Sequence, residues 1–424
     1  MISHLLSAIR FVPLDPSSPK LFGFSELLAG LALMVLAWTI ADSRYRFRVS
    51  IAPVPLQRST FAVVVVVGVL SLLTDLWRAQ SWPVPEGNLI TPAEWQAVLA
   101  GAFLLTFLAW AWFAFIRPPT YGRLNSLRYA RALYRTILKG SVSELAVIAD
   151  EVARSAGSLI RFATEGRPKG RLRSGREIDN RRPNVASLAN DILLLIADAR
   201  FCCAIVESSP GTALAIFREI ARTGKYEVRI KQFAKNILNE ALLYKNSFLF
   251  HETEGYESGF MGYFKPLSKA MFSNYAMAES IGTLFDVDLQ AKLDSTQLKA
   301  YCRIVLLTFR DYVGRDHSSY PSSLYSAFDY IARFPGELYK INGTPDLSWE
   351  NDILARTRVV VGFFQEAVDI LNESEPPNRL GTHLRTQGSE DEDFYDRLAK
   401  AIVELIASAS AVRFPPSTCW WVQY

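Results

Sequence analysis

The sequence has little of the chemistry that catalytic or metal centres need. Its 424 residues contain only four histidines and four cysteines. No cysteine has CxxC spacing, and no histidine pair lies near one to complete a zinc site. The nucleotidase phosphate loop (GxxxxGKS/T), the dinucleotide motif GxGxxG, HExxH, GxSxG and the kinase signatures are also absent. We therefore expect no enzyme activity, no cofactor and no bound metal.

One histidine keeps a weak enzymatic alternative open. His251 stands beside Glu252 and Glu254, a set that a metal or an acid–base pair could use. Adjacency in a sequence is weak evidence for either. The neighbouring Cys202 and Cys203 lie in an apolar stretch, and we interpret them as core residues, because free cysteine is commonly buried.

Charge of either sign is scarce in the first third of the chain, where the longest apolar runs lie. The three runs are Leu21–Ala41, Thr60–Trp77 and Ala97–Ile116. Each has about the length that a helix needs to cross roughly 30 Å of hydrocarbon. The preceding residues 1–20 do not resemble a cleavable signal peptide, because a Pro/Ser-rich break interrupts them. We predict a three-helix transmembrane module over residues 21–117, preceded by a short extracytoplasmic segment.

Arginine placement predicts the orientation of this module. The basic residues flanking the runs are Arg44, Arg46, Arg48 and Arg58 in the first linker, and Arg117, Arg123, Arg128, Arg131 and Arg135 after the third run. The second linker has Arg78 but also Glu86 and Glu94. The positive-inside rule places the first linker and everything after Arg117 in the cytoplasm. Three crossings then place the N-terminus outside the inner (cytoplasmic) membrane.

Polar residues at the outer end of the second run are the candidates for a pore lining. They are Ser71, Thr74 and Asp75. A ring of carboxylates at a pore mouth would attract cations. The alternative is that Asp75 caps an interfacial turn and pairs with Arg78. Because three helices cannot enclose an aqueous path, any pore requires a homo-oligomer in the lipid bilayer.

The remaining residues, 118–424, have the pattern of an all-α cytoplasmic domain. Ser141 and Glu144 have the spacing of a capping box, which predicts a helix that runs to about Thr164. The other expected helices are 184–207, 212–222, 227–250, 295–313, 322–333, 348–371 and 391–412. No internal repeat is evident.

A basic segment interrupts this helical pattern at residues 167–183. Its cations are Arg167, Lys169, Arg171, Arg173, Arg176, Arg181 and Arg182. One interpretation is a solvated loop that lies on anionic lipid. The other is a contact with phosphate or an oligonucleotide, because arginine forks match phosphate oxygens.

An aromatic, glycine-rich segment follows at residues 248–275. It could be a folded loop that fills the helical core. It could instead be a ligand platform, on which Tyr256 and Tyr263 stack on bases and Lys265 or Lys269 meets phosphate.

The sequence also resembles a known family. The stretch His251–Pro266, HETEGYESGFMGYFKP, the basic segment and the overall layout are similar to membrane effectors of bacterial antiphage defence. In particular they resemble the channel subunit of the Hailong system, the HalA family. The resemblance implies a channel held closed by short DNA oligomers that a partner nucleotidyltransferase makes. Loss of these oligomers on infection would open the channel and depolarise the cell. The basic or the aromatic segment would be the oligonucleotide contact.

Three functional hypotheses follow. The first is an oligomeric ion channel or pore gated by the cytoplasmic domain. The second is a membrane-anchored receptor or scaffold that recruits a cytosolic partner without conducting. The third and weakest is a membrane enzyme centred on His251 and Glu254.

Overall fold

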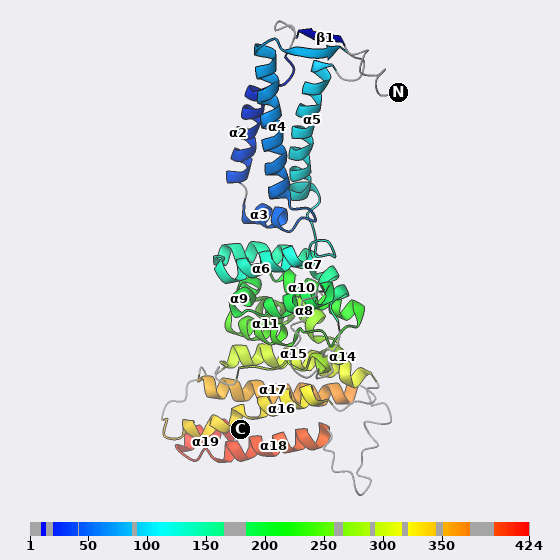
Figure 1. Ribbon diagram of the computed structural model, residues 1–424. Helices are drawn as coiled ribbons and strands as arrows, with labels where there is room; N and C mark the ends of the chain where they lie inside the picture. Colours follow the sequence, from blue (N-terminus) through cyan, green and yellow to red (C-terminus); the bar gives the residue numbers. More distant parts are fainter. Residues whose placement is uncertain are drawn as a thin grey trace, which may run out of the picture. The chain divides into compact units, whose positions relative to one another are not determined.

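The structure is a computed structural model and describes residues 10–13, 20–40, 42–86, 91–164, 184–257, 266–288, 293–315, 321–344, 351–373 and 394–423. Its described residues are almost entirely helical, which confirms the all-α prediction (Figure 1). The exception is a short antiparallel pair of strands, β1 (Arg10–Pro13) and β2 (Pro83–Glu86). The chain divides into two compact units, unit 1 (Met1–Thr136) and unit 2 (Ile137–Tyr424).

Unit 1 is built on the three predicted apolar runs. The helices are α2 (Phe24–Ile40), α3 (Ser43–Ser50), α4 (Leu56–Ala79), α5 (Pro92–Ala111) with a π-helical end η1 (Trp112–Ile116), and α6 (Ser126–Lys139), which continues into unit 2. Local chemistry sets several of these ends. Asp42 caps α3, and a capping box of Thr91 and Glu94 starts α5, with Pro92 in its first turn.

Close approach of small residues packs the three long helices of unit 1. Leu27, Val67 and Leu99 come one from each helix and form a buried cluster. A Cβ on Gly30 of α2 would lie 2.7 Å from the ring of Phe103 on α5. Packing of this kind, in which a glycine lets a neighbouring helix approach, is common between helices in lipid.

Hydrogen bonds to backbone carbonyls hold the α3 end of unit 1 together. The buried Arg48 donates to the carbonyl of Ala114 at 2.9 Å, and Arg128 donates to that of Ala52 at 2.6 Å. The Asn125 amide donates to the carbonyls of Ile51 and Thr120 at 2.8 and 2.9 Å. The boundary predicted at Arg117 therefore lies inside unit 1, because the chain beyond it is bonded to the turn between α3 and α4.

Unit 2 contains the remaining helices. They are α7 (Val142–Phe162), α8 (Val185–Leu195), α9 (Ala199–Ser208), α10 (Gly211–Thr223), α11 (Lys231–Leu243), α12 (Phe248–Glu257), α13 (Pro266–Phe272), α14 (Tyr275–Ile281), α15 (Ser295–Gly314), α16 (Ser322–Ala332), the 3-10 helix η2 (Phe334–Ile341), α17 (Asp352–Glu373), α18 (Phe394–Ser410) and α19 (Pro416–Gln423). The capping box predicted at Ser141 and Glu144 is present and starts α7.

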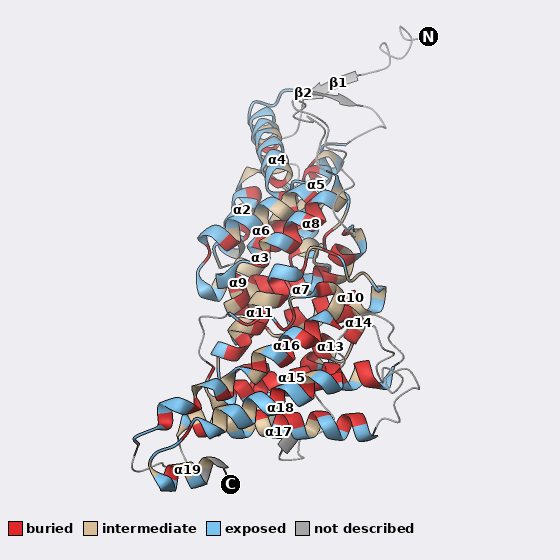
Figure 2. Cartoon of the chain, turned by 90° about the horizontal axis from the view of Figure 1, so that it is seen from below, coloured by how far each residue is buried: buried red, intermediate tan, exposed pale blue. Residues whose placement is uncertain are grey.

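The core of unit 2 lies between paired helices. Helix α7 packs on α10, and α15 packs on α17. In Figure 2, α7, α13 and α15 show much buried surface, whereas α4 of unit 1 is mostly exposed. Phe394 at the start of α18 contacts the rings of Phe309 on α15 and Phe328 on α16, at 5.0 and 5.4 Å between centroids. Aromatic contacts thus join helices that are far apart in the sequence.

Two of the predicted helices are wrong as single elements. The expected helix 184–207 breaks at Ile196–Asp198, where the Asp198 carboxylate accepts from the backbone N–H of Phe201 and starts α9. The expected helix 227–250 breaks between Leu243 and Phe248, where Ser247 donates to the carbonyl of Ala241. In both cases a short polar side chain competes for the helix hydrogen bonds.

Candidate functional sites

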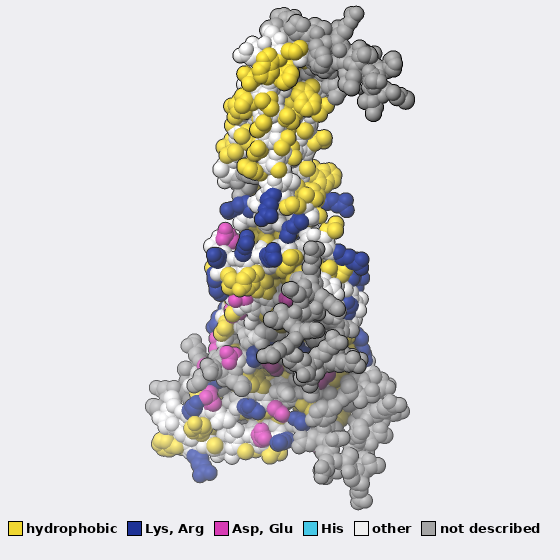
Figure 3. Space-filling view, in the orientation of Figure 1, with side chains coloured by type: hydrophobic (Ala, Val, Ile, Leu, Met, Phe, Trp, Pro, Cys, Tyr) yellow, Lys and Arg dark blue, Asp and Glu magenta, His cyan; other side chains and the backbone are white. Residues whose placement is uncertain are grey.

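The most extensive chemical feature of unit 1 is an apolar surface on its long helices. Helices Leu56–Ala79 and Pro92–Ile116 have the length and composition to cross a membrane, and 17% of the most apolar stretch of each is buried. Helix α2 is also apolar but has 17 residues, about 25 Å at 1.5 Å per residue. Large side chains such as Leu33, Phe61 and Leu105 are exposed. Hydrophobic side chains cover much of the surface of the long helices in Figure 3. A core helix of a soluble protein would be mostly buried, and these helices are not.

Aromatic and basic residues lie where this apolar surface ends. At one end, Trp77 and Trp82 are exposed and their rings meet edge to face at 5.0 Å. At the other, Trp112 and Phe115 are exposed just before Arg117. Basic side chains gather next to the apolar surface at this second end (Figure 3).

The three pore candidates all have partners or neighbours inside unit 1. Ser71 is only 1% exposed. The Thr74 hydroxyl donates to the carbonyl of Leu70 at 2.7 Å and accepts from the indole of Trp95 at 3.1 Å. Both residues therefore face the interior of the three-helix group in a single subunit.

Asp75 holds the start of α2. Its carboxylate accepts from the backbone N–H of Phe24 at 2.9 Å and from the ammonium of Lys20 at 3.1 Å. The amide oxygen of Gln96 on α5 accepts from the N–H groups of Leu21 and Phe22 at 2.8 and 3.3 Å. Two neighbouring helices thus supply acceptors for N–H groups at the beginning of α2, which otherwise lack helical partners. The alternative role predicted for Asp75 is to cap a turn and pair with Arg78. Asp75 does act as a cap, but the element that it caps is α2, and the cation that it contacts is Lys20.

The sequence candidates for oligonucleotide contact lie mostly outside the described residues. This applies to the whole basic set (Arg167, Lys169, Arg171, Arg173, Arg176, Arg181 and Arg182), to Tyr263 and Lys265, and to the side chain of Tyr256. Their role as ligand contacts stays a prediction.

Glu252 is buried and bonded within the fold, whereas the neighbouring His251 is exposed. Its buried carboxylate accepts from the backbone N–H groups of Leu267 at 3.1 Å and Ser268 at 2.8 Å, at the start of α13. His251 is exposed, and the side chain of Glu254 lies outside the described residues. Among the residues that the structure describes, no group of three or more His, Cys, Asp or Glu side chains could hold a metal ion.

The cysteines of unit 2 lie in surroundings that suppress nucleophilic chemistry. Burial raises the pKa of the Cys202 and Cys302 thiols. Burial, together with the neighbouring Glu207, raises the pKa of Cys203 to about 11. A thiol is nucleophilic only as the thiolate, so these three stay protonated and unreactive near neutral pH.

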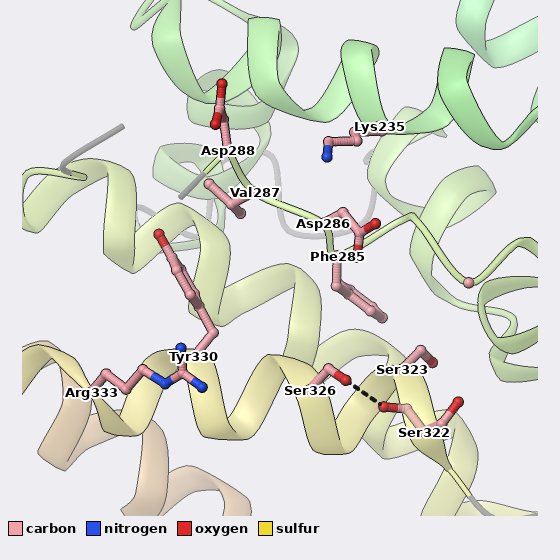
Figure 4. A pocket seen from close by; sticks show the side chains of 11 residues that line it. Lys235, Phe285, Asp286, Val287, Asp288, Ser322, Ser323, Ser326, Tyr330 and Arg333 are labelled. Atoms are coloured by element: carbon pink, nitrogen blue, oxygen red, sulfur yellow. Dashed lines mark hydrogen bonds between the residues drawn. The ribbon is translucent and has the colours of Figure 1, made fainter. Parts of the chain in front are cut away.

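A half-open cavity of about 560 Å³ lies in unit 2 between α11, α16 and the segment after α14 (Figure 4). Its lining residues are Lys235, Gly282, Phe285, Asp286, Val287, Asp288, Ser322, Ser323, Ser326, Tyr330 and Arg333. The volume lies in the range of small-molecule sites. Sequence reasoning missed this cavity, because its residues are spread over about a hundred positions and form no motif.

The cavity lining offers both hydrogen-bond donors and acceptors. The hydroxyls of Ser323 and Ser326 already donate, to Glu279 and to the carbonyl of Ser322. Neither Lys235 nor Arg333 has a side-chain hydrogen bond or ion pair to any residue that the structure describes. Burial raises the pKa of Tyr330, so its hydroxyl is also a donor at neutral pH. The serine hydroxyls and the carboxylates of Asp286 and Asp288 are acceptors, so the lining suits a polar ligand that carries both donors and acceptors.

Comparisons of the chain with models of protein families, with curated proteins and with solved structures found no match.

Proposed function

We propose that the protein is an integral membrane protein that crosses the inner membrane with α2, α4 and α5 and keeps unit 2 in the cytoplasm. We further propose that several copies form an ion channel or pore whose opening the cytoplasmic helices control. The observation that carries the membrane assignment is the exposed apolar surface of the long helices. Lipid chains would cover this surface, whereas its exposure to water would be unfavourable in free energy.

The interior of one subunit supports a pore between subunits rather than within one. Leu27, Val67 and Leu99 fill the space where the three helices meet, and Ser71 is buried beside them on α4. A single subunit therefore has no aqueous path along its axis in the described residues. Conduction requires an assembly in which faces of α2, α4 or α5 from several copies surround water.

The proposed gating ligand follows from the resemblance and from the chemistry of unit 2. We propose a short oligonucleotide or nucleotide, supplied by a partner nucleotidyltransferase, and a role in antiphage defence by membrane depolarisation. The basic segment, the aromatic segment and the cavity of unit 2 are three places where such a ligand could bind. The Hailong resemblance favours the first two, while the cavity offers Lys235 and Arg333 next to the carboxylates of Asp286 and Asp288.

Ion flux from vesicles tests the channel proposal directly. The purified full chain would be reconstituted into vesicles loaded with potassium, and its subunit number measured in the same detergent by native mass spectrometry. We expect an oligomer, and a potassium efflux that changes when a short single-stranded oligodeoxynucleotide is added to the side of unit 2. Protein-free vesicles of the same lipid are the control. A monomer, or an oligomer that conducts neither with nor without the oligonucleotide, would rule out the channel.

One observation favours the non-conducting receptor as the second candidate. Thr74 and Asp75 already form hydrogen bonds with Trp95, Phe24 and Lys20 within the subunit, and Ser71 is buried there, so all three have a place in the packing of a single subunit. Under this alternative the full chain inserts and binds a cytosolic partner or ligand, but vesicles containing it stay impermeable to potassium.

A further inference from the structure

Arginine is concentrated at one end of unit 1 to an unusual degree. Residues 42–74 and 95–136 contain nine arginines, one acidic residue (Asp42) and no lysine. Six of these arginines are exposed, and we call them the arginine collar: Arg46, Arg58, Arg117, Arg123, Arg131 and Arg135. A positive surface of this kind needs an anionic partner or a layer of counterions.

Seven of the nine arginines fall into two kinds by their contacts. Arg48 is buried and Arg128 half-buried, and each donates to a backbone carbonyl of unit 1. By contrast, the side chains of Arg58, Arg117 and Arg123 make no hydrogen bond or ion pair to any described residue, and the same holds for Arg131 and Arg135. Arg48 and Arg128 therefore have a structural role in unit 1, whereas the guanidinium donors of the other five are available to a ligand.

The collar adjoins the apolar surface within a single turn of helix. On α4, Arg58 precedes the exposed Phe61 by three residues, which puts the two on the same face. On the antiparallel α5, Arg117 directly follows the exposed Ile116, and its backbone N–H donates to the carbonyl of Trp112 at 2.8 Å. The change from apolar to cationic thus occurs at the same end of both helices.

We propose that the arginine collar binds the phosphate groups of anionic phospholipids, whose acyl chains cover the neighbouring apolar surface. This inference rests on the proposed membrane insertion of α4 and α5. An arginine fork binds phosphate oxygens in pairs, and its charge favours anionic over zwitterionic headgroups. Continuity with the apolar surface favours lipid over nucleic acid, because only a lipid presents phosphate and hydrocarbon to adjacent positions.

Lipid binding to the full chain in a neutral detergent tests the proposal. Native mass spectrometry would measure bound dioleoyl phosphatidylglycerol against bound dioleoyl phosphatidylcholine, added in equal amounts. The collar variant carries Arg58→Gln, Arg117→Gln and Arg123→Gln. Its matched control carries Arg218→Gln, Arg310→Gln and Arg413→Gln, three exposed arginines of unit 2 with the same loss of charge.

We expect the wild type and the control to prefer phosphatidylglycerol, and the preference to fall roughly fivefold for each collar arginine removed, since a basic residue near an anionic surface contributes about this factor. Raising NaCl to 1 M should weaken the preference by screening. An equal preference in collar variant and control, or no preference in the wild type, would overturn the proposal. Displacement of the lipid by an oligodeoxynucleotide would assign the collar to nucleic acid instead. A chain that takes up neither lipid would contradict membrane insertion itself.

Discussion

At the scale of single residues, Asp75 shows how a carboxylate in an apolar helix can be stabilised without a pore. It accepts from Lys20 and from the backbone N–H of Phe24, so its charge has both a counterion and a dipole partner. Sequence reasoning identified Asp75 as a residue with a special role. It could not identify the partners, because Lys20 and Phe24 lie 55 and 51 positions away along the chain.

Two replacements of Asp75 should distinguish the contribution of its hydrogen bond to Phe24 from that of its negative charge. We expect Asp75→Ala to lower the stability of the full chain by about 1–2 kcal/mol, the usual cost of losing a helix cap. Asp75→Asn keeps an oxygen that can accept from Phe24 and should cost less than half as much. Thermal unfolding in detergent measures both. Equal stability of the alanine variant and the wild type would contradict the capping role.

Glu240 on α11 predicts a pH dependence of stability in unit 2. Burial and the nearby Glu207 raise its pKa above the ordinary value of 4.5. The folded chain therefore binds a proton on the Glu240 carboxyl more tightly than the unfolded chain does. The stabilising contribution of this proton to the free energy of unfolding is largest below pH 4.5 and is lost as pH rises through the pKa of the folded chain.

Glu240→Gln should remove the loss of stability that the ionisation of Glu240 causes as pH rises. We expect its melting temperature to exceed that of the wild type by about 1–2 °C at pH 7.5, and the difference to shrink by pH 4. Glu404→Gln, on the exposed face of α18, is the matched control and should show no such pattern. A difference that does not depend on pH would argue against the role of the Glu240 charge.

At the scale of elements, the contact between α2 and α5 depends on the absence of a side chain at Gly30. A Cβ there would lie 2.7 Å from Phe103, whereas a Cβ on Gly101 of α5 would meet nothing within 4 Å. Alanine at Gly101 brings only the gain in helix propensity, while alanine at Gly30 also pushes the helices apart.

We expect Gly30→Ala to destabilise unit 1 by about 1–2 kcal/mol and Gly101→Ala to be neutral or stabilising. Chemical or thermal unfolding in detergent would compare the two. Trimming the ring with Phe103→Leu should recover part of the loss caused by Gly30→Ala. If the two glycine variants behave alike, the close approach of α2 and α5 is not what stabilises the group.

The sequence predicted the elements that are marked by residues close together in the chain. The apolar runs predicted α4 and α5 to within a few residues, and the capping box at Ser141 predicted the start of α7. Helix α3 was read as a linker, because its eight residues carry three arginines and no long apolar run. The break at Asp198 had no glycine or proline to mark it. The cavity of unit 2 has no local signal at all, since tertiary packing alone brings Lys235 and Arg333 to one space.

At the scale of the whole molecule, the distribution of cysteine offers a direct test of orientation. All four native cysteines lie in unit 2, so unit 1 can carry a single introduced thiol. Gln80 and Val54 are exposed at opposite ends of α4. The proposed orientation places Gln80 outside the cell and Val54 in the cytoplasm.

We expect a membrane-impermeant maleimide to label Gln80→Cys in intact cells and Val54→Cys only after permeabilisation. The wild-type chain reports on unit 2 through the partly exposed Cys419, which should be labelled only after permeabilisation. Labelling of both introduced thiols, or of the native ones, in intact cells would contradict the orientation.

The bonds that hold the start of α2 also have a consequence for biosynthesis. Helix α2 is made before the other long helices, but Asp75 and Gln96, the acceptors for the N–H groups of Phe24 at its start and of Leu21 just before it, follow 51 and 75 residues later. Until the ribosome has produced α4 and α5, these N–H groups need water or lipid headgroups as partners, since hydrocarbon offers none. If α2 crosses the membrane as we propose, its start therefore stays at the membrane surface until the hairpin of α4 and α5 has been inserted.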